Sequence, residues 1–300
     1  MLDLRENYGL LTQAIQECTD RALACGALHP IETTQVMIPD GGVEFMVRSV
    51  SNLSRKAREG KTQKTEKPPG FNPFLPPEPE LLVAEVSDTH LAILNKFNVI
   101  DSHLLLITRD FEDQERLLGY CDFLALWRCL QEFDGLGFYN GGKTAGASQR
   151  HKHLQLVPLP LVPGISGTPM DTLWPGSAVP GKLLTLPALP FPHLFTALPD
   201  GIGIDIEDAA RLCLAAYRDM LKQAGIDGAV TDHGEYQSAP YNLLLARQWM
   251  LLTPRSRECW HGISINALGF AGSLFVPDPE NIEQIRLAGP MKILSAVTHP

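Results

Sequence analysis

The 300-residue sequence lacks any run of about 18 apolar residues, the length that a membrane-spanning helix needs. Its first 30 residues mix charged and apolar side chains, without a basic segment followed by an apolar core. We therefore expect neither a membrane-spanning helix nor a signal peptide. Hydrophobic residues still make up 44% of the chain, which excludes a fully disordered protein.

Cysteine is sparse, and its spacing is uninformative for metal binding. The chain has six cysteines, and none forms a CxxC pair, so zinc-ribbon and thioredoxin-type motifs are excluded. Cys18, Cys121 and Cys213 lie in apolar, helix-like stretches, where a free cysteine behaves as a small hydrophobic residue. A reducing compartment is expected, and we predict a cytoplasmic protein.

The chain has 25 lysine and arginine residues against 34 aspartate and glutamate residues, so its formal net charge is −9. A protein built mainly to coat nucleic acid would lean basic. We therefore expect neither a nucleic-acid partner nor a membrane partner. The net charge leaves room for a local basic pocket that binds a small anion.

The hydrophobic periodicity predicts an α+β fold, with a mainly antiparallel sheet and helices packed on it. Helices are expected over 3–27, 111–134, 206–224 and 279–298. Strands are expected over 43–50, 81–87, 90–95, 103–108 and 151–158, and the segments 241–256 and 259–276 are interpreted as a strand pair.

Three segments are expected to be irregular. Residues 54–80 are polar and then proline-rich, and residues 135–149 are rich in glycine. Residues 158–199 contain ten prolines, which is enough to prevent long regular structure. The length allows one or two domains. We predict an N-terminal catalytic region over 1–157, a proline-rich connection over 158–199, and a C-terminal region over 200–300 that packs on the same core.

The most informative segment runs from Gly146 to Val157 and contains the sequence HKHLQ. Alternate residues of a strand share a face, so His151, His153 and Gln155 point one way and the leucines between and after them point the other way. Directly before this strand, small residues offer backbone N–H groups and the Ser148 hydroxyl, as phosphate-binding loops do.

This arrangement favours a nucleophilic histidine in a phosphate pocket. An imidazole is largely neutral near pH 7, and its attack on an α-phosphorus would form a covalent phosphoramidate. His153 is the best placed, because it has a polar neighbour on each side. A metal-binding pair and a merely polar strand face are the alternatives. No Cys, Asp or Glu stands close in sequence to complete a ligand set, so no metal site is predicted.

The sequence GASQRHKHLQ, with YNGG before it, resembles the diadenosine tetraphosphate (Ap4A) phosphorylases, or ATP adenylyltransferases. These belong to the histidine-triad and galactose-1-phosphate uridylyltransferase superfamily. The segments HLAILNKFNVIDSHLLLIT, YNLLLARQWMLLTPRS and INALGFAGSLF are similar to that family as well, so the resemblance extends from about residue 45 to 276. It implies a fold of the histidine-triad and uridylyltransferase type.

The resemblance also implies roles for individual residues. His153 would be the nucleophile that carries AMP, with His151 beside it in the catalytic motif. Gln155 stands where the hydrolytic branch has a third histidine, and it would contact the α-phosphate. The other substrate-binding residues implied are Lys56, Asn95, Lys96, Asn140, Gly141, Gly142, Ser148, Gln149, Arg150, Asn266 and Ser273. Asn98 replaces the usual proline of the family.

Two other features allow more than one interpretation. The basic run over 55–67 is either a solvated loop or a lid that closes on polyphosphate. His103 is interpreted as structural.

The expected activity is the reversible cleavage of Ap4A by phosphate to ATP and ADP. A nucleotide hydrolase, a hexose-1-phosphate uridylyltransferase and a dinucleotide-sensing module that does not turn over remain alternatives. Mg²⁺ could accompany the nucleotide, no organic cofactor is expected, and the sequence is compatible with a monomer.

Overall fold

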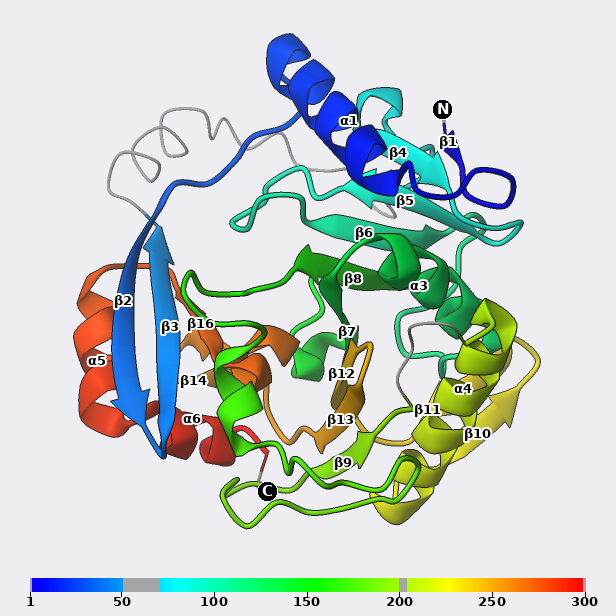
Figure 1. Ribbon diagram of the computed structural model, residues 1–300. Helices are drawn as coiled ribbons and strands as arrows, with labels where there is room; N and C mark the ends of the chain where they lie inside the picture. Colours follow the sequence, from blue (N-terminus) through cyan, green and yellow to red (C-terminus); the bar gives the residue numbers. More distant parts are fainter. Residues whose placement is uncertain (1, 51–70, 200–203, 299–300) are drawn as a thin grey trace.

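The computed structural model describes residues 2–50, 71–199 and 204–298, and a nine-stranded sheet runs through its centre (Figure 1). The strand order is β1-β4-β5-β6-β8-β7-β12-β13-β9. Neighbouring strands are antiparallel except for β1 and β4, which confirms the predicted α+β fold with a mainly antiparallel sheet. The strands are β1 (Leu2–Asp3), β4 (Leu82–Glu85), β5 (His90–Leu94), β6 (Leu104–Thr108), β7 (Gly135–Gly141), β8 (His153–Pro158), β9 (Leu194–Ala197), β12 (Tyr241–Ala246) and β13 (Trp249–Pro254).

A smaller sheet has the order β16-β3-β2, and two hairpins complete the strands that the structure describes. β16 is parallel to β3, which is antiparallel to β2. The expected pairing of 241–256 with 259–276 is therefore wrong: the first segment forms the hairpin β12–β13 by itself, and the second ends in β16 of the smaller sheet. These strands are β2 (Thr33–Asp40), β3 (Val43–Val50), β10 (Gly228–Thr231), β11 (Gly234–Gln237), β14 (Cys259–Trp260), β15 (Ile263–Ser264) and β16 (Ser273–Val276).

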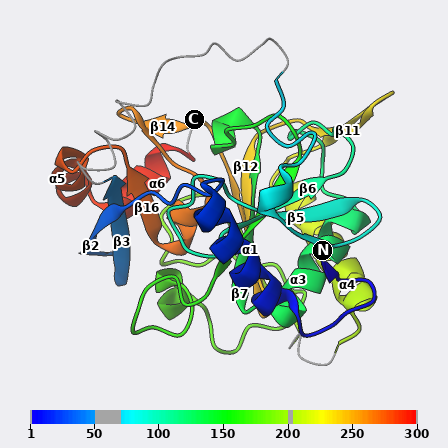
Figure 2. The ribbon, with the colours of Figure 1, turned by 90° about the horizontal axis from the view of Figure 1, so that it is seen from above.

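Helices cover the nine-stranded sheet on one face, and the smaller sheet lies over the other. The first face packs on α1, α3 and α4 in one apolar core, and the second core joins β3, β16 and the C-terminal helices α5 and α6. Figure 2 shows β2, β3 and α5 on the opposite side of the molecule from α4. The α-helices are α1 (Leu11–Cys25), α3 (Tyr120–Glu132), α4 (Ile206–Gln223), α5 (Glu280–Ala288) and α6 (Pro290–Ala296), and the 3₁₀ helices are η1 (Pro79–Leu81), η2 (Lys143–Ala145), η3 (Pro169–Leu173) and η4 (Ala267–Ala271).

The segment expected as a glycine-rich loop contains a central strand, β7, whose seven residues are all buried. A strand with both faces covered shows no alternation of polar and apolar residues, so the pattern that marks a half-buried strand is absent. The glycines serve packing here. A Cβ atom on Gly137 would lie 2.7 Å from Leu126 Cδ1 of α3, so the helix can approach the strand only if this residue is glycine.

Three of the predicted helices have other bounds in the structure than the sequence suggested. The first begins at Leu11 instead of residue 3, because β1 pairs with β4 at the start of the chain. The second begins at Tyr120 instead of residue 111. Residues 112–117 instead exchange backbone hydrogen bonds with residues 150–152 and 235. The tail forms two helices, because Gly289 at φ 85° and Pro290 separate them.

The proline-rich stretch lacks long regular structure, as predicted; it holds η3 and β9, and β9 pairs with β13 at the edge of the larger sheet. Strands from both predicted regions join in that sheet, because β7 of the first pairs with β12 of the second. The boundaries at residues 157 and 200 stay a prediction. In the described part of the chain, no helix has the length and apolarity to span a bilayer.

Candidate active site

Strand β8 places the motif side chains as the alternation predicts. His153 lies opposite Ile107 of β6 and Gln155 lies opposite Leu105, on the face with the small apolar cluster that includes Phe74. Leu154 and Leu156 belong to the core under α1, α3 and α4. The strand thus presents its polar groups on one side and anchors itself by its apolar side chains on the other.

A cavity of about 370 Å³ opens on this polar face, and we call it the His153 cavity. Its apolar walls include Ile31, Phe74, Phe97 and Leu105. This combination of an apolar wall with a few polar groups is typical of nucleotide-sized ligand sites. The structure brings together here six residues of the predicted set: Asn95, Lys96, Ser148, Gln149, His153 and Gln155.

The His153 ring is held in one orientation. Its Nδ1 lies 2.8 Å from the carbonyl oxygen of His151, so Nδ1–H donates and Nε2 carries the lone pair. The backbone on either side is fixed by Gln114, whose Oε1 accepts from His153 N at 2.8 Å and whose Nε2 donates to His153 O at 3.2 Å. Burial lowers the pKa of His153 to about 4, against the hydrogen bond to His151 that raises it. The imidazole is therefore neutral and nucleophilic at pH 7.

His151 lies outside the cavity wall, with both ring nitrogens engaged. Nε2–H donates to the carbonyl oxygen of Thr108 at 2.8 Å, and Nδ1 accepts from Asn72 Nδ2 at 2.8 Å. Its ring meets the edges of Phe74 and Phe111. The structure therefore gives the His151 ring a structural place, and its carbonyl group is what reaches the His153 ring.

A buried histidine, His103, connects Gln155 to Asn95, a second residue that lines the His153 cavity. Gln155 Oε1 lies 2.9 Å from His103 Nε2, and His103 Nδ1 lies 3.2 Å from Asn95 Nδ2. Asn95 Oδ1 accepts in turn from the backbone N–H of Phe97 at 3.3 Å. Burial lowers the pKa of His103 to about 4.

The loop before β8 reaches the cavity through Ser148 and Gln149, and its earlier residues lie elsewhere. Asn140 is buried, and its Oδ1 accepts from Asn242 Nδ2 at 2.8 Å and from Ala267 N at 2.9 Å. Gly141 and Gly142 pack against Gln237, and Gly142 also packs against Glu115. Arg150 is exposed and pairs with Asp113 at 2.6 Å. The structure thus places these four predicted residues outside the His153 cavity.

Lys96 lines the cavity with its charge already paired. Its Nζ donates to both carboxylate oxygens of Glu78, at 2.7 and 2.8 Å. Glu78 is the one carboxylate among the cavity residues of the described chain. Lys56 and the basic run 55–67 lie outside the described residues.

Asn266 and Ser273 line a second cavity of about 460 Å³, which we call the Arg48 cavity. Arg48 is the one charged residue among its described lining residues, and the structure shows no carboxylate paired with it there. Its Nη2 donates to Leu161 O at 2.9 Å and its Nη1 to Ser273 Oγ, while Nε has no hydrogen-bond partner among the residues that the structure describes. Burial lowers its pKa. The two cavities share Ile31, and the loop that supplies Ser148 begins at Gly146 of the Arg48 cavity.

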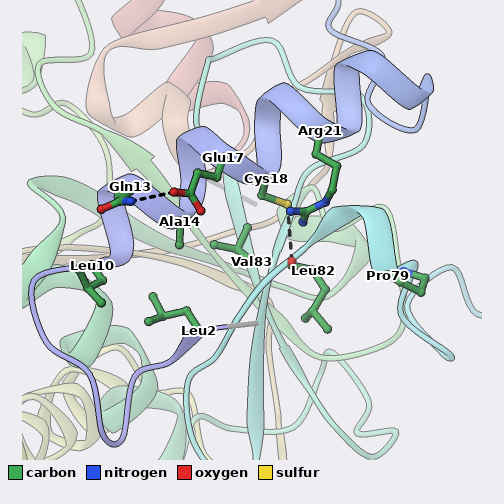
Figure 3. A pocket seen from close by; sticks show the side chains of 10 residues that line it. All are labelled: Leu2, Leu10, Gln13, Ala14, Glu17, Cys18, Arg21, Pro79, Leu82 and Val83. Atoms are coloured by element: carbon green, nitrogen blue, oxygen red, sulfur yellow. Dashed lines mark hydrogen bonds between the residues drawn. The ribbon is translucent and has the colours of Figure 1, made fainter.

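A third cavity, of about 440 Å³, lies between α1 and β4 (Figure 3). Gln13 Nε2 donates to Glu17 Oε1 at 2.7 Å across its edge, and Cys18 Sγ donates to Leu82 O at 3.6 Å. It contains none of the predicted site residues. The candidate chemistry is therefore concentrated in the His153 cavity and its neighbour.

Residues 2–175, more than half of the chain, match the family model described as the Ap4A phosphorylase N-terminal domain. The chain belongs to this family. Residues 187–300 match the model of the ATP adenylyltransferase C-terminal domain. The predicted resemblance to the Ap4A phosphorylases is confirmed.

Known Ap4A phosphorylases resemble the chain over nearly its whole length. Diadenosine 5',5'''-P1,P4-tetraphosphate phosphorylase 2 of Saccharomyces cerevisiae is 27% identical over 278 residues, which are 85% of this chain and 82% of that protein. The crystal structure of yeast Ap4A phosphorylase Apa2 has a TM-score of 0.77 at 26% identity and covers 97% of both chains. Its complex with AMP has a TM-score of 0.75 at 25% identity, covering 97% of this chain and 96% of that one.

Sequence reasoning missed three residues of this Ap4A phosphorylase family site. Gln114 and His103 are 39 and 52 positions from the motif residues they hold, so no local pattern connects them. Arg48 did leave a signal, because it is a charged residue in the otherwise mostly apolar strand VEFMVRSV. A charge at the centre of a buried strand requires a partner or a ligand.

Proposed function

We propose that the chain catalyses the reversible cleavage of Ap4A by phosphate to ATP and ADP. One observation supports this most directly: the unprotonated Nε2 of His153 is available in a nucleotide-sized cavity of an Ap4A phosphorylase family member. A neutral imidazole there can attack phosphorus without a separate base. Three polar residues beside it, Ser148, Gln149 and Gln155, can donate to the phosphoryl oxygens.

In the first step, the Nε2 lone pair of His153 forms a bond to the α-phosphorus of Ap4A. The bond from that phosphorus to the bridging oxygen breaks, and ATP leaves with the electron pair. The ring keeps its Nδ1 proton and becomes positively charged, and the His151 carbonyl oxygen, 2.8 Å away, stabilises this charge. In the second step, a phosphate oxygen attacks the same phosphorus, the P–N bond breaks, and ADP leaves with neutral His153 restored.

Gln155 favours phosphate over water as the acceptor. A third histidine could give a proton to a poor leaving group, whereas an amide has no titratable proton near pH 7. An amide at this position therefore suits a reaction in which the leaving nucleotide needs no proton and the acceptor is an anion such as phosphate. This distinguishes the proposal from a hydrolase of the histidine-triad type.

We place the two halves of the dinucleotide in the two cavities. The transferred AMP would occupy the His153 cavity, which provides the apolar wall and the nucleophile. The rest of the polyphosphate would run along the 146–149 loop to the Arg48 cavity, where Arg48 provides a positive charge with no carboxylate paired to it in the described chain. The shared lining residue Ile31 makes this path short.

Mg²⁺, where it takes part, would be carried by the polyphosphate. Within 2–50, 71–199 and 204–298, no group of three His, Cys, Asp or Glu side chains is arranged to hold a metal ion. Glu78, the carboxylate in the cavity wall, is engaged by Lys96. Since Mg²⁺ often binds through substrate phosphates, one protein carboxylate or none is sufficient.

A reducing compartment such as the cytoplasm fits the thiols. All six cysteines are free, and Cys18, Cys129 and Cys213 are buried in the core. We propose a cytoplasmic protein that acts on small molecules, with no nucleic-acid or membrane partner.

Incubation of the protein with Ap4A, with and without phosphate, tests the proposal. Phosphate should give ADP and ATP in equal amounts, and without phosphate the reaction should stop after about one ATP per enzyme. AMP and ATP released continuously in phosphate-free buffer would show a hydrolase. Binding without products would show a sensing module, and turnover of a nucleoside-diphosphate hexose in place of Ap4A would show a uridylyltransferase.

A further inference from the structure

Four hydrogen-bonding groups in a row lead from the backbone of the β5–β6 connection to the His153 cavity. They are the N–H of Phe97, the side-chain amide of Asn95, the ring of His103 and the side-chain amide of Gln155. Asn95 and Gln155 line the cavity and His103 does not. Within this row, His103 reaches a ligand in the cavity through these two amides.

The chemistry of the first group fixes the direction of the whole row. A backbone N–H can only donate, so Asn95 must present Oδ1 to Phe97 and Nδ2 to His103. The Asn95 amide then donates to His103 Nδ1 at 3.2 Å, which places the ring proton on Nε2. His103 Nε2–H donates to Gln155 Oε1 at 2.9 Å, and the NH₂ of Gln155 is left for the cavity.

Burial keeps this direction constant. His103 is only 8% exposed, and the pKa of its ring is lowered to about 4. At neutral pH the ring therefore carries one proton, and Asn95 determines which nitrogen carries it. Without that ring, nothing in the row would decide which end of the Gln155 amide faces the cavity.

We propose that His103 is a positioning residue, which holds the Gln155 amide with its NH₂ toward the transferred phosphoryl group. The inference rests on the proposed function. A donor in that position stabilises the negative charge on the phosphoryl oxygens while His153 attacks. If the Gln155 amide were reversed, its Oε1 would face the phosphoryl oxygens and repel them. The role of His103 is therefore to exclude the reversed state.

The test is the rate at which AMP is transferred to the enzyme in a single turnover with Ap4A and no phosphate. Gln155→Ala should slow this step by about 100- to 1000-fold, as loss of one such donor does. His103→Leu, which removes the donor to Gln155 and keeps a similar volume, should slow it by about 10- to 100-fold and change the KM for Ap4A by less than about 3-fold. His103→Gln keeps a donor near the Nε2 position and should restore most of the rate.

A double variant separates positioning from a general structural effect. In the Gln155→Ala background, His103→Leu should cause less than about 3-fold further loss, because the amide that His103 positions is gone. The matched control is His193→Leu. His193 is also buried, and its ring also makes two hydrogen bonds, but these go to Leu186 and Phe191, away from the His153 cavity. It should leave the transfer rate within about 3-fold.

Equal losses from His103→Leu in both backgrounds would overturn the proposal, and so would a folded His103→Leu protein with the full transfer rate. If the parent protein itself transferred no AMP from Ap4A, the proposed function would fail instead. The two failures are distinguished by the parent protein alone.

Discussion

At the scale of single residues, the proposed reaction depends on the lone pair of one imidazole. His153→Ala should lower the Ap4A turnover rate by far more than 100-fold, because the covalent step requires that nitrogen. The fold should persist, since within the described residues the ring makes one hydrogen bond, to the His151 carbonyl. Steady-state rates, with circular dichroism as the folding control, check this. A residual rate above about one-hundredth would contradict the nucleophile assignment.

The sequence could identify His153 and Gln155 because alternate residues of a strand share a face, which is a local rule. The two residues are two positions apart on β8 and do lie on the same face. The sequence could not identify the residues that hydrogen-bond to these two and hold them in place. The partner of Gln155 lies directly before β6 and that of the His153 backbone lies in the segment before α3, and only the tertiary fold brings these together. The same limit explains why Asn140 resembled a ligand contact: its motif context is local, whereas its partners are Asn242 and Ala267.

At the scale of elements, β8 is anchored on its other face by a buried ion pair. Lys152 Nζ lies 2.7 Å from Asp122 Oδ2 of α3, and His90 Nε2 lies 3.1 Å from Asp122 Oδ1. Burial by itself would raise the pKa of Asp122, but Lys152 and His90 hold it below its ordinary value. The pair fixes the start of the strand that carries His153.

Lys152→Met should therefore lower the free energy of unfolding by about 3–5 kcal/mol, because it leaves a buried carboxylate without its cation. Urea unfolding at pH 7 measures this. Arg211→Met, which breaks an exposed ion pair on α4, is the control and should leave the stability nearly unchanged. Equal effects of the two substitutions would show that the buried pair does not anchor β8.

The strands that could be predicted are those with a recognisable pattern, such as β5, β6 and β8. β7 was missed because its three glycines are typical of a loop, whereas in the fold Gly137 lies against Leu126 of α3. The start of the second helix was misplaced because residues 112–117 bond to the residues directly before β8 and to Glu235 instead of to their own helix. In each case a tertiary contact outweighed the local pattern.

At the scale of the whole molecule, acid should destabilise the fold. The pKa values of His103 and His153 are lowered from 6.5 to about 4 by burial, so between these values the unfolded chain binds more protons than the folded one. Stability is then complete above about pH 6.5 and falls toward pH 4, by at most about 1.4 kcal/mol per pH unit for each histidine. The pKa values of His151 and His193 are lowered too, which acts in the same direction.

Urea unfolding at pH 7, 6 and 5 tests this expectation, and His103→Gln, which removes one titrating ring, should reduce the slope. Stability that stayed constant or rose on acidification over this range would show that the two rings are not held neutral by the fold.

The two cavities predict how the whole molecule divides the substrate. Arg48→Met should raise the KM for Ap4A by about 10- to 100-fold, because it removes a charged partner of the polyphosphate, and should leave the rate of AMP transfer at saturation within about 3-fold. Arg211→Met on the far side of the molecule is the charge-matched control. Equal KM values for the parent protein and Arg48→Met would place the distal phosphates elsewhere.

The most direct test of the account is the covalent intermediate. Enzyme mixed with Ap4A in phosphate-free buffer and quenched at alkaline pH, where a phosphoramidate is stable, should carry one AMP on the peptide that contains His153. Phosphate added before the quench should release this AMP as ADP. Substrate consumed in a single turnover with that peptide unmodified would contradict transfer through His153 and require direct attack of phosphate on Ap4A.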